Sequence, residues 1–306
     1  MTGTLYSCFD FRFASEIPLG ELTAAASDDA RPIVTIRYGD LPDDLPDQAV
    51  GERYLQRHGD DVLLRIPQVG LYLMRGGREI VVAPFAGAAE RNVRLFLLGS
   101  ALGVLAYQRG LLPLHANAVV IDGKAYGFCG PSGAGKSTLA AHFAEAGYPV
   151  LCDDVCALSF DADGRPLAWP GLPRLKLWQD AADRLGHDTA TLDRAIEGYD
   201  KYHVAIPSAA APGPVPFARL YLLDRAGEGA PASITRLRGT QAMGVVMENS
   251  YRPNYVARLG LNTVHFRACS AVVRHAAVFA AHRGWGYDIF AREAAGLVAH
   301  ARDAAA

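Results

Sequence analysis

Hydrophobic and polar residues alternate in short runs over the first third of the chain. Four such runs cover residues 33–38, 62–66, 70–75 and 79–83, and alternation with a period of two is typical of strands that bury one face. The last two runs are separated by Arg75-Gly76-Gly77-Arg78, which predicts a tight turn between them. The sequence therefore predicts a small, mostly β N-terminal domain over residues 1–86.

Leucine and alanine then recur at helical spacing over residues 87–110, and this helix is predicted to open a second domain, residues 87–306. Residues 114–121 and 124–129 predict two strands, joined by Asp122-Gly123, which is a strong signal for a two-residue hairpin. A helix over residues 136–146 and a strand over 149–152 follow. Alternating strands and helices predict a mixed α/β fold.

The second half of the chain has a less regular pattern. It predicts strands over residues 157–160, 166–169, 202–206 and 218–224, helices over 175–185, 240–249, 267–282 and 294–302, and a short late strand over 287–290. The proline-rich segment Pro207–Pro216 is predicted to be a flexible loop.

Composition narrows the class of protein. The chain has 306 residues, of which 50% are hydrophobic, and a formal net charge of −2. This balance gives no broad attraction to nucleic acid or to an anionic membrane, and neither partner is expected. No basic start with an apolar run opens the chain, and no apolar stretch is long enough to cross a membrane. The five cysteines are odd in number and form no C-x-x-C pair, which argues against a disulfide framework and a structural zinc site and favours a reducing cytoplasm.

A glycine-rich phosphate loop follows the predicted hairpin. The segment Gly130-Pro131-Ser132-Gly133-Ala134-Gly135-Lys136-Ser137 matches G-x-x-x-x-G-K-[ST] in full, between a predicted strand and a predicted helix. Such loops turn backbone N–H groups toward phosphate oxygens, while the lysine adds a charge and the hydroxyl ligates Mg²⁺. The predicted nucleotide-binding residues are Gly130, Ser132, Gly133, Ala134, Gly135, Lys136, Ser137 and Thr138.

Two adjacent aspartates, Asp153 and Asp154, end the next predicted strand, so that one helix separates them from the loop. Phosphoryl transfer to a hydroxyl requires an acidic group at the metal and a base for the proton of the acceptor. Two carboxylates can divide these roles. The alternative is that one aspartate serves the metal and the other only caps a turn, since adjacent side chains on a strand point to opposite faces.

Other charged candidates surround this stretch. His115 begins the hairpin strand and can bind a phosphate or an aspartate, although a lone histidine is more often structural. Candidates for neutralising charge on the phosphoryl group are the basic residues Arg252, Arg174, Lys176 and Lys201. A basic side chain in a loop is more often a solvated surface residue.

These motifs resemble the HPr kinase/phosphorylase family, whose core is related to that of phosphoenolpyruvate carboxykinase. The resemblance covers about residues 111–160 and is carried by Leu114-His115-Ala116, the phosphate loop and Leu151-Cys152-Asp153-Asp154-Val155. It implies an HPr-kinase-like P-loop core with a mixed sheet. By position, it implies that His115 assists at the phosphate, that Lys136 and Ser137 hold the triphosphate and Mg²⁺, that Asp153 is the general base and that Asp154 supports the metal.

The chain departs from the family pattern after the acid pair. A glutamate-arginine-glycine signature is missing, Pro173–Trp178 occupies its place, and the C-terminal arginine-rich loop is reduced to Tyr251-Arg252-Pro253. Leu112-Pro113-Leu114-His115 and Lys176-Leu177-Trp178 look more like the divergent kinases that tailor lasso peptides. Those enzymes phosphorylate a serine near the C-terminus of a precursor peptide.

The sequence thus predicts a kinase that uses Mg²⁺ and ATP, or another nucleoside triphosphate, to phosphorylate a serine of a peptide or small protein. The predicted catalytic residues are Asp153, His115, Lys136 and Arg252, and the predicted metal site is Ser137 with Asp154. Two alternatives remain open: a kinase of a small metabolite, and a nucleotide-binding regulatory module without phosphoryl transfer. The oligomeric state is also open, a homo-oligomer included.

Overall fold

A computed structural model describes residues 5–26, 28–46, 54–195, 199–206, 213–226, 231–284 and 286–303. The chain forms two compact units. The first comprises Met1–Pro113 with Arg252–His265, and the second comprises Leu114–Tyr251 with Phe266–Ala306. Among the described residues, no helix combines the length and the apolar character that a bilayer crossing requires.

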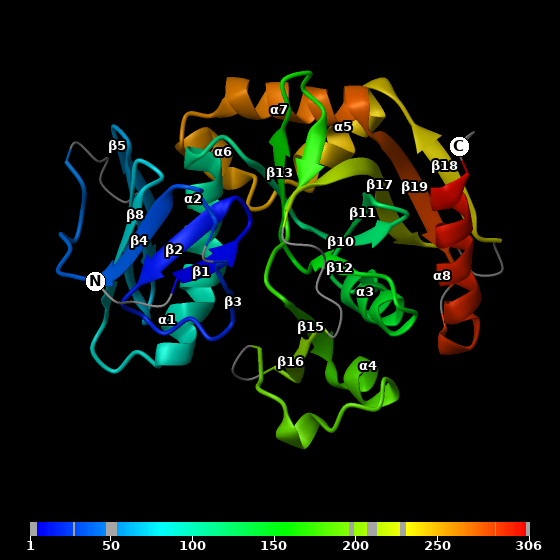
Figure 1. The fold of residues 1–306 in the computed structure, drawn as a ribbon, viewed down its shortest axis with the longest axis horizontal. Coiled ribbons are helices and arrows are strands. Elements are labelled where there is room, and N and C mark those ends of the chain that lie inside the picture. Colours follow the sequence, from blue (N-terminus) through cyan, green and yellow to red (C-terminus); the bar gives the residue numbers. More distant parts are fainter. Residues whose placement is uncertain are drawn as a thin grey trace. The chain divides into compact units, whose positions relative to one another are not determined.

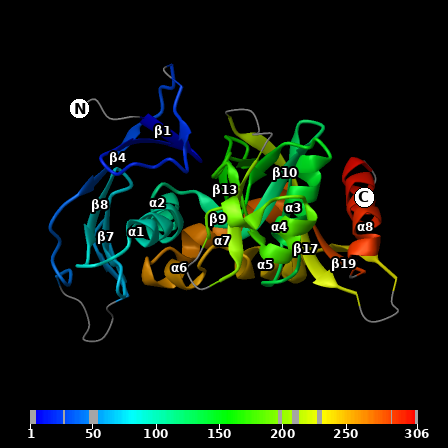
Figure 2. The same ribbon diagram turned by 90° about the horizontal axis from the view of Figure 1, so that it is seen from below.

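The first unit is built on a mixed sheet with the strand order β3-β1-β2-β4-β8-β7-β6-β5, part of which is seen in Figure 2. Its strands are β1 (Leu5–Cys8), β2 (Phe11–Ser15), β3 (Thr23–Ala24), β4 (Ile33–Tyr38), β5 (Leu55–His58), β6 (Asp61–Ile66), β7 (Gly70–Arg75) and β8 (Glu79–Pro84). The four alternating runs are confirmed as β4, β6, β7 and β8. The predicted turn is also confirmed: Gly76 and Gly77 have positive φ, and Arg75 pairs with Glu79.

The helical segment after β8 belongs to this first unit. It consists of α1 (Glu90–Phe96), a π-helical turn (Leu97–Ala101) and α2 (Leu102–Gln108). The Tyr72 hydroxyl on β7 donates to the carbonyl of Val93 on α1 at 2.9 Å, and the π-helical turn also contacts β7. These contacts with the sheet explain why the first unit extends to Pro113, beyond the boundary at residue 86 that the sequence predicts. The short α6 (Asn254–Arg258) lies in the same unit.

The second unit is built on another mixed sheet. Strands β12, β10, β11, β17, β14 and β13 follow in that order, and β19, which also pairs with β18, lies along β17. The bounds are β10 (Ala116–Ile121), β11 (Lys124–Cys129), β12 (Val150–Cys152), β13 (Cys156–Phe160), β14 (Pro166–Ala168), β17 (Val215–Arg225), β18 (Ser233–Leu237) and β19 (Ala277–Arg283). A three-residue strand, β9 (Leu112–Leu114), falls at the boundary between the units in the sequence. The predicted hairpin is confirmed as β10 and β11.

Helices cover both sides of this sheet. The helices α3 (Lys136–Glu145) and α8 (Tyr287–Arg302) share one apolar core with β10, β11, β17 and β19. At its centre, Tyr221 stacks between Phe128 and Phe279, with ring centroids 5.4 Å apart on each side. Helix α5 (Gly239–Glu248) contacts β19, and Figure 1 shows α5 and α7 (Asn262–His275) on the side of the sheet away from α3.

Three segments differ from the predicted secondary structure. Residues 175–185 were predicted as a helix, but β15 (Arg174–Trp178) precedes α4 (Gln179–Arg184), because β15 pairs with β16 (Lys201–Ala205) and buries alternate leucines. A 3₁₀ turn (Thr189–Thr191) follows α4. The predicted helix over 267–282 ends at His275, where the strand β19 takes over beside β17. Residues 287–290 begin α8 and are not a strand. Most of the predicted loop Pro207–Pro216 lies outside the described residues.

Truncation of Tyr221 tests how far the second unit depends on this aromatic stack. Tyr221 is fully buried, so Tyr221→Ala is expected to lower the free energy of unfolding by about 3–5 kcal/mol. Tyr221→Phe keeps the ring and loses only the hydroxyl contact with His300 Nδ1, so it should cost about 1 kcal/mol. Chemical denaturation monitored by circular dichroism measures both. Equal losses in the two variants would contradict a central role for the ring.

Candidate active site

The phosphate loop connects β11 directly to α3, as predicted. Its backbone turns at glycines with positive φ, namely Gly130, Gly133 and Gly135. Gly130 cannot be replaced without a shift of the backbone, because a Cβ there would lie 2.5 Å from the carbonyl oxygen of Leu223 on β17. The loop therefore lies close against the central strand of the sheet. Its glycines let the chain reach the N-terminus of α3, where free backbone N–H groups favour an anion.

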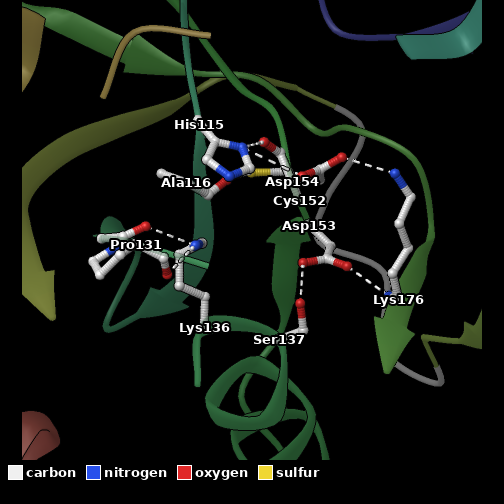
Figure 3. Close-up of polar contacts among 10 residues, drawn as sticks. His115, Ala116, Pro131, Lys136, Ser137, Cys152, Asp153, Asp154 and Lys176 are labelled. Atoms are coloured by element: carbon white, nitrogen blue, oxygen red, sulfur yellow. Dashed lines mark hydrogen bonds and ion pairs between the residues drawn. The ribbon is translucent and has the colours of Figure 1, made fainter. Parts of the chain in front are cut away.

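Lys136 begins α3 and turns back over the loop (Figure 3). Its Nζ donates to the carbonyls of Gly130 at 2.8 Å and Pro131 at 3.1 Å. Burial lowers the pKa of Lys136, an effect opposed chiefly by the charge of Asp154. The ammonium group thus lies within the loop, where an incoming phosphate can replace the two carbonyl contacts.

Asp153 is a buried carboxylate with two hydrogen bonds. Its Oδ1 accepts from Ser137 Oγ at 3.1 Å, and its Oδ2 accepts from the backbone N–H of Lys176 at 2.7 Å. Only 6% of the residue is exposed. Burial, reinforced by the negative charge of Asp154, raises the pKa of Asp153 above its ordinary value, against the opposing hydrogen bond from Lys176. One carboxylate therefore joins the first turn of α3 to β15.

Asp154 has different partners although it is the next residue. Its Oδ2 lies 2.7 Å from Lys176 Nζ and its Oδ1 lies 3.3 Å from His115 Nδ1, and Figure 3 shows these two side chains on opposite sides of the carboxylate. Burial opposes ionisation of Asp154, but Lys176 and His115 outweigh it and hold its pKa well below the usual range. Lys176 in turn has a raised pKa, because Asp154 outweighs the effect of burial. Asp154 is therefore a persistent anion between two basic groups.

A pocket of about 280 Å³ brings these groups together. The residues around it come from the strand before the loop, the loop with α3, the acid pair, and the β15, α4 and β16 segment: His115, Asn117, Ser132, Gly133, Gly135, Lys136, Ser137, Thr138, Asp153, Asp154, Lys176, Trp178, Asp180, Ala181 and Lys201. Three lysines and three aspartates face one cavity. Such a site suits an anionic ligand that carries a cation.

Asn117 is a pocket residue that the sequence reasoning missed. It is 1% exposed, and neither its amide nitrogen nor its amide oxygen has a hydrogen-bond partner among the described residues. Two and four positions further on, Val119 and Ile121 pack in the apolar core with α3, so the alternation of β10 puts Asn117 on the same face, at its loop end. A polar residue within the apolar run Ala116–Ile121 was the available signal.

The donor set fits a nucleotide with Mg²⁺. Ser137 Oγ and Asp153 Oδ1 lie together at the start of α3, and hard oxygen ligands are those that Mg²⁺ prefers. No cluster of three or more His, Cys, Asp or Glu residues able to hold a metal is found among the described residues. Asn117 supplies a buried amide to the same pocket.

The predicted site residues fall into two groups. His115, Lys136, Asp153 and Asp154 line one pocket with most of the loop, and Gly130 and Ala134 belong to the loop without lining that pocket. Of the secondary candidates, Lys176 and Lys201 line the pocket, whereas Arg174 is not among its lining residues. Arg252 belongs to the first unit, where its guanidinium lies 5.7 Å from the ring centroid of Tyr255, and it is not among the lining residues either.

Comparison with known proteins adds little to this geometry. No family model matches the chain, and no curated protein matches it. Among solved structures, the Hpr(Ser) kinase/phosphatase from Coxiella burnetii is similar to 62% of this chain and 95% of that chain, at 12% sequence identity and a TM-score of 0.34. A likeness this weak carries no weight for fold or chemistry. The side-chain contacts of the pocket carry the functional interpretation.

Replacing Asn117 by leucine separates ligand binding from stability. The amide is buried without partners among the described residues, so Asn117→Leu is expected to leave the free energy of unfolding unchanged or to raise it by up to about 1–3 kcal/mol. Loss of a hydrogen bond to a charged phosphate should weaken ATP binding about tenfold. Calorimetric titration and thermal unfolding measure the two effects. The exposed Asn254→Leu is the control, and a destabilised Asn117→Leu protein with full ATP affinity would mark Asn117 as structural.

Proposed function

We propose that this chain is a kinase that transfers the γ-phosphoryl group of a nucleoside triphosphate to a hydroxyl, that of a serine in a peptide or small protein. The observation that carries the proposal is the divided acid pair: next to a complete phosphate loop, Asp153 contacts Ser137 while Asp154 contacts His115 and Lys176. A loop alone serves many reactions. Two carboxylates in separate environments supply the two roles that transfer to a hydroxyl requires.

The contacts favour one division of labour between the two aspartates. Ser137 hydrogen-bonds to Asp153 and not to Asp154, so a metal held by the Ser137 hydroxyl has Asp153 as its nearest carboxylate. When bound, Mg²⁺ neutralises charge on the phosphate oxygens. Asp154, whose side chain is 31% exposed, is the more accessible carboxylate for an acceptor. We therefore assign the metal to Ser137 with Asp153 and the base to Asp154, the reverse of the roles that the family resemblance implies.

The transfer then uses groups that are already in the pocket. The acceptor hydroxyl oxygen forms a bond to the γ-phosphorus, the bond from that phosphorus to the bridging oxygen breaks to release the diphosphate, and the hydroxyl proton passes to Asp154. Lys136 and the other two lysines of the pocket stabilise charge on the phosphoryl group. The low pKa of Asp154 keeps it ionised over the physiological range, so that it is unprotonated when the acceptor binds. It is a weak base, and the larger share of the rate enhancement is assigned to stabilisation of charge by the lysines.

The narrower acceptor is the C-terminal serine of a lasso precursor peptide. The support for it is confined to sequence motifs, Leu112-Pro113-Leu114-His115 and Lys176-Leu177-Trp178. In the structure, both motifs contribute to the pocket through His115, Lys176 and Trp178. Trp178 is 44% exposed, which leaves an aromatic ring accessible to an acceptor chain.

A direct assay tests the kinase. Purified protein is incubated with ATP, Mg²⁺ and paired peptides ending in serine or alanine, and with small alcohols, and the products are measured by mass spectrometry. A phosphate gained only by the serine peptide supports the proposal. Transfer to a small alcohol alone identifies a metabolite kinase, and tight ATP binding without transfer identifies a regulatory module; either result overturns the peptide-kinase proposal.

Two substitutions test the division of roles. Asp154→Asn should lower kcat by about 10²- to 10⁴-fold with nucleotide affinity nearly unchanged, whereas Asp153→Asn should chiefly weaken the Mg²⁺ dependence of ATP binding. Asp163→Asn is the matched control, because its carboxylate forms an exposed ion pair with Arg165. Thermal unfolding checks that loss of the Lys176 pair has not unfolded the Asp154 variant. The opposite pattern of effects restores Asp153 as the base.

The raised pKa of Asp153 gives a pH dependence. Asp153 must be ionised to hold the cation, so the Mg²⁺-dependent part of ATP affinity should fall as pH drops through its raised pKa, that is, at a midpoint above the ordinary 3.8. Calorimetric titrations of ATP, with and without Mg²⁺, at several pH values between about 4.5 and 8 measure this loss of affinity. Asp153→Asn is the control for titration of the nucleotide itself. An identical pH profile in that variant would contradict the assignment.

A further inference from the structure

A second, smaller pocket of about 140 Å³ adjoins the first one. Gly135, Thr138 and Asp180 line both pockets, so the two cavities meet at the first turn of α3. The second pocket has no contribution from Lys136, Asp153 or Asp154. Its other walls are Arg283, Gly284, Gly286 and Phe290, at the end of β19 and the start of α8.

The walls of this second pocket suit a planar, partly apolar group. Phe290 presents an aromatic side chain that is held by an edge-on contact with His142, with ring centroids 5.5 Å apart. Gly284 and Gly286 form part of the wall without side chains. A Cβ on Gly284 would lie 2.4 Å from Ile289 Cδ1, and Gly286 has a φ of 144°. Larger residues at these two positions would clash or strain the backbone.

Arg283 supplies a buried donor to the same pocket. The residue is 6% exposed, and one guanidinium nitrogen donates to the carbonyl of Ala134 in the phosphate loop at 2.7 Å. Its Nε has no hydrogen-bond partner among the described residues. The guanidinium therefore lies in the wall of this pocket beside the phosphate loop, where it can donate to a polar group of a ligand.

The direction of the phosphate chain connects the two pockets. In a phosphate loop the lysine reaches the outer phosphates and the hydroxyl residue serves the metal, while the backbone holds the inner phosphates. Lys136 and the acid pair therefore mark the γ-phosphate end in the first pocket. The nucleoside must leave the loop at the other end of the phosphate chain. Of the two cavities that meet at Gly135 and Thr138, only the second lacks the transfer groups.

We propose that this second pocket is the nucleoside site, in which Phe290 contacts the face of the base and the Arg283 guanidinium donates to an acceptor on the nucleoside. This inference rests on the proposed function only in its choice of a nucleoside triphosphate as the ligand. It assigns affinity for the base to β19 and α8. These two elements are separate from those that carry the transfer chemistry.

Binding of ATP is compared with binding of inorganic tripolyphosphate, which lacks a nucleoside. Phe290→Ala should weaken ATP binding about tenfold, since contact of a base with an aromatic ring contributes on that order, and should leave tripolyphosphate binding within about twofold. Phe290→Leu retains apolar bulk on α8 and should give a smaller loss for ATP, which keeps the test valid where the alanine variant is unstable. Calorimetric titration in Mg²⁺ buffer measures both ligands.

Arg283→Lys tests the donor. Lysine retains the charge and lacks the planar guanidinium with its several donors, so ATP binding should weaken while tripolyphosphate binding is preserved. Equal losses for both ligands would show that Arg283 serves only the phosphate loop. Unchanged ATP binding in both Phe290 variants, with ATP binding abolished in Lys136→Ala, would move the nucleoside elsewhere and leave the kinase proposal intact. Wild-type protein that binds neither ligand would overturn the proposed function itself.

Discussion

The enclosed carboxylate of Asp153 is the constraint on which the site depends. Burying a charge is unfavourable unless each oxygen finds a donor. Here the donors come from two elements distant in sequence, the Ser137 hydroxyl on α3 and the backbone N–H of Lys176 on β15. These two hydrogen bonds thus hold the phosphate loop, the acid pair and β15 together. The same arrangement brings Lys176 Nζ within hydrogen-bond distance of Asp154.

Two neighbouring carboxylates can face one pocket because the strand ends before them. Side chains on a strand alternate between faces, which would separate Asp153 from Asp154. Strand β12 ends at Cys152, however, and Asp154 has a φ of 72°, in the left-handed region that non-glycine residues seldom occupy. The backbone reversal turns both carboxylates into the cavity. Strain of this kind persists where surrounding contacts hold it, and those of Lys176 and His115 do so here.

Local motifs made much of the site predictable from the sequence. The hairpin, the loop glycines, Lys136 and the acid pair lie within about forty residues, and short-range turn and helix signals were sufficient to order them. Pocket residues on elements whose structure depends on a partner distant in the sequence were harder to predict. The interpretation of residues 175–185 as a helix hid the β-strand position of Lys176, and the predicted late strand at residues 287–290 hid Phe290 on α8. In both cases the partner strand or core face decided the structure, and a single sequence does not show the partner.

The eleven-residue strand β17 fixes the distance between strands β11 and β19, each of which leads to one of the two pockets. It pairs in parallel with β11, which runs into the phosphate loop, and on its other edge in parallel with β19, which ends at Arg283. Neighbouring strands lie about 4.8 Å apart, so two strand spacings, about 10 Å, separate the lines of β11 and β19. Hydrogen bonds of a sheet interior hold that span, and loop movements cannot readily change it. The sheet therefore fixes the distance between the ends of β11 and β19. A ligand that contacts both ends would be selected by its length as well as by its charge.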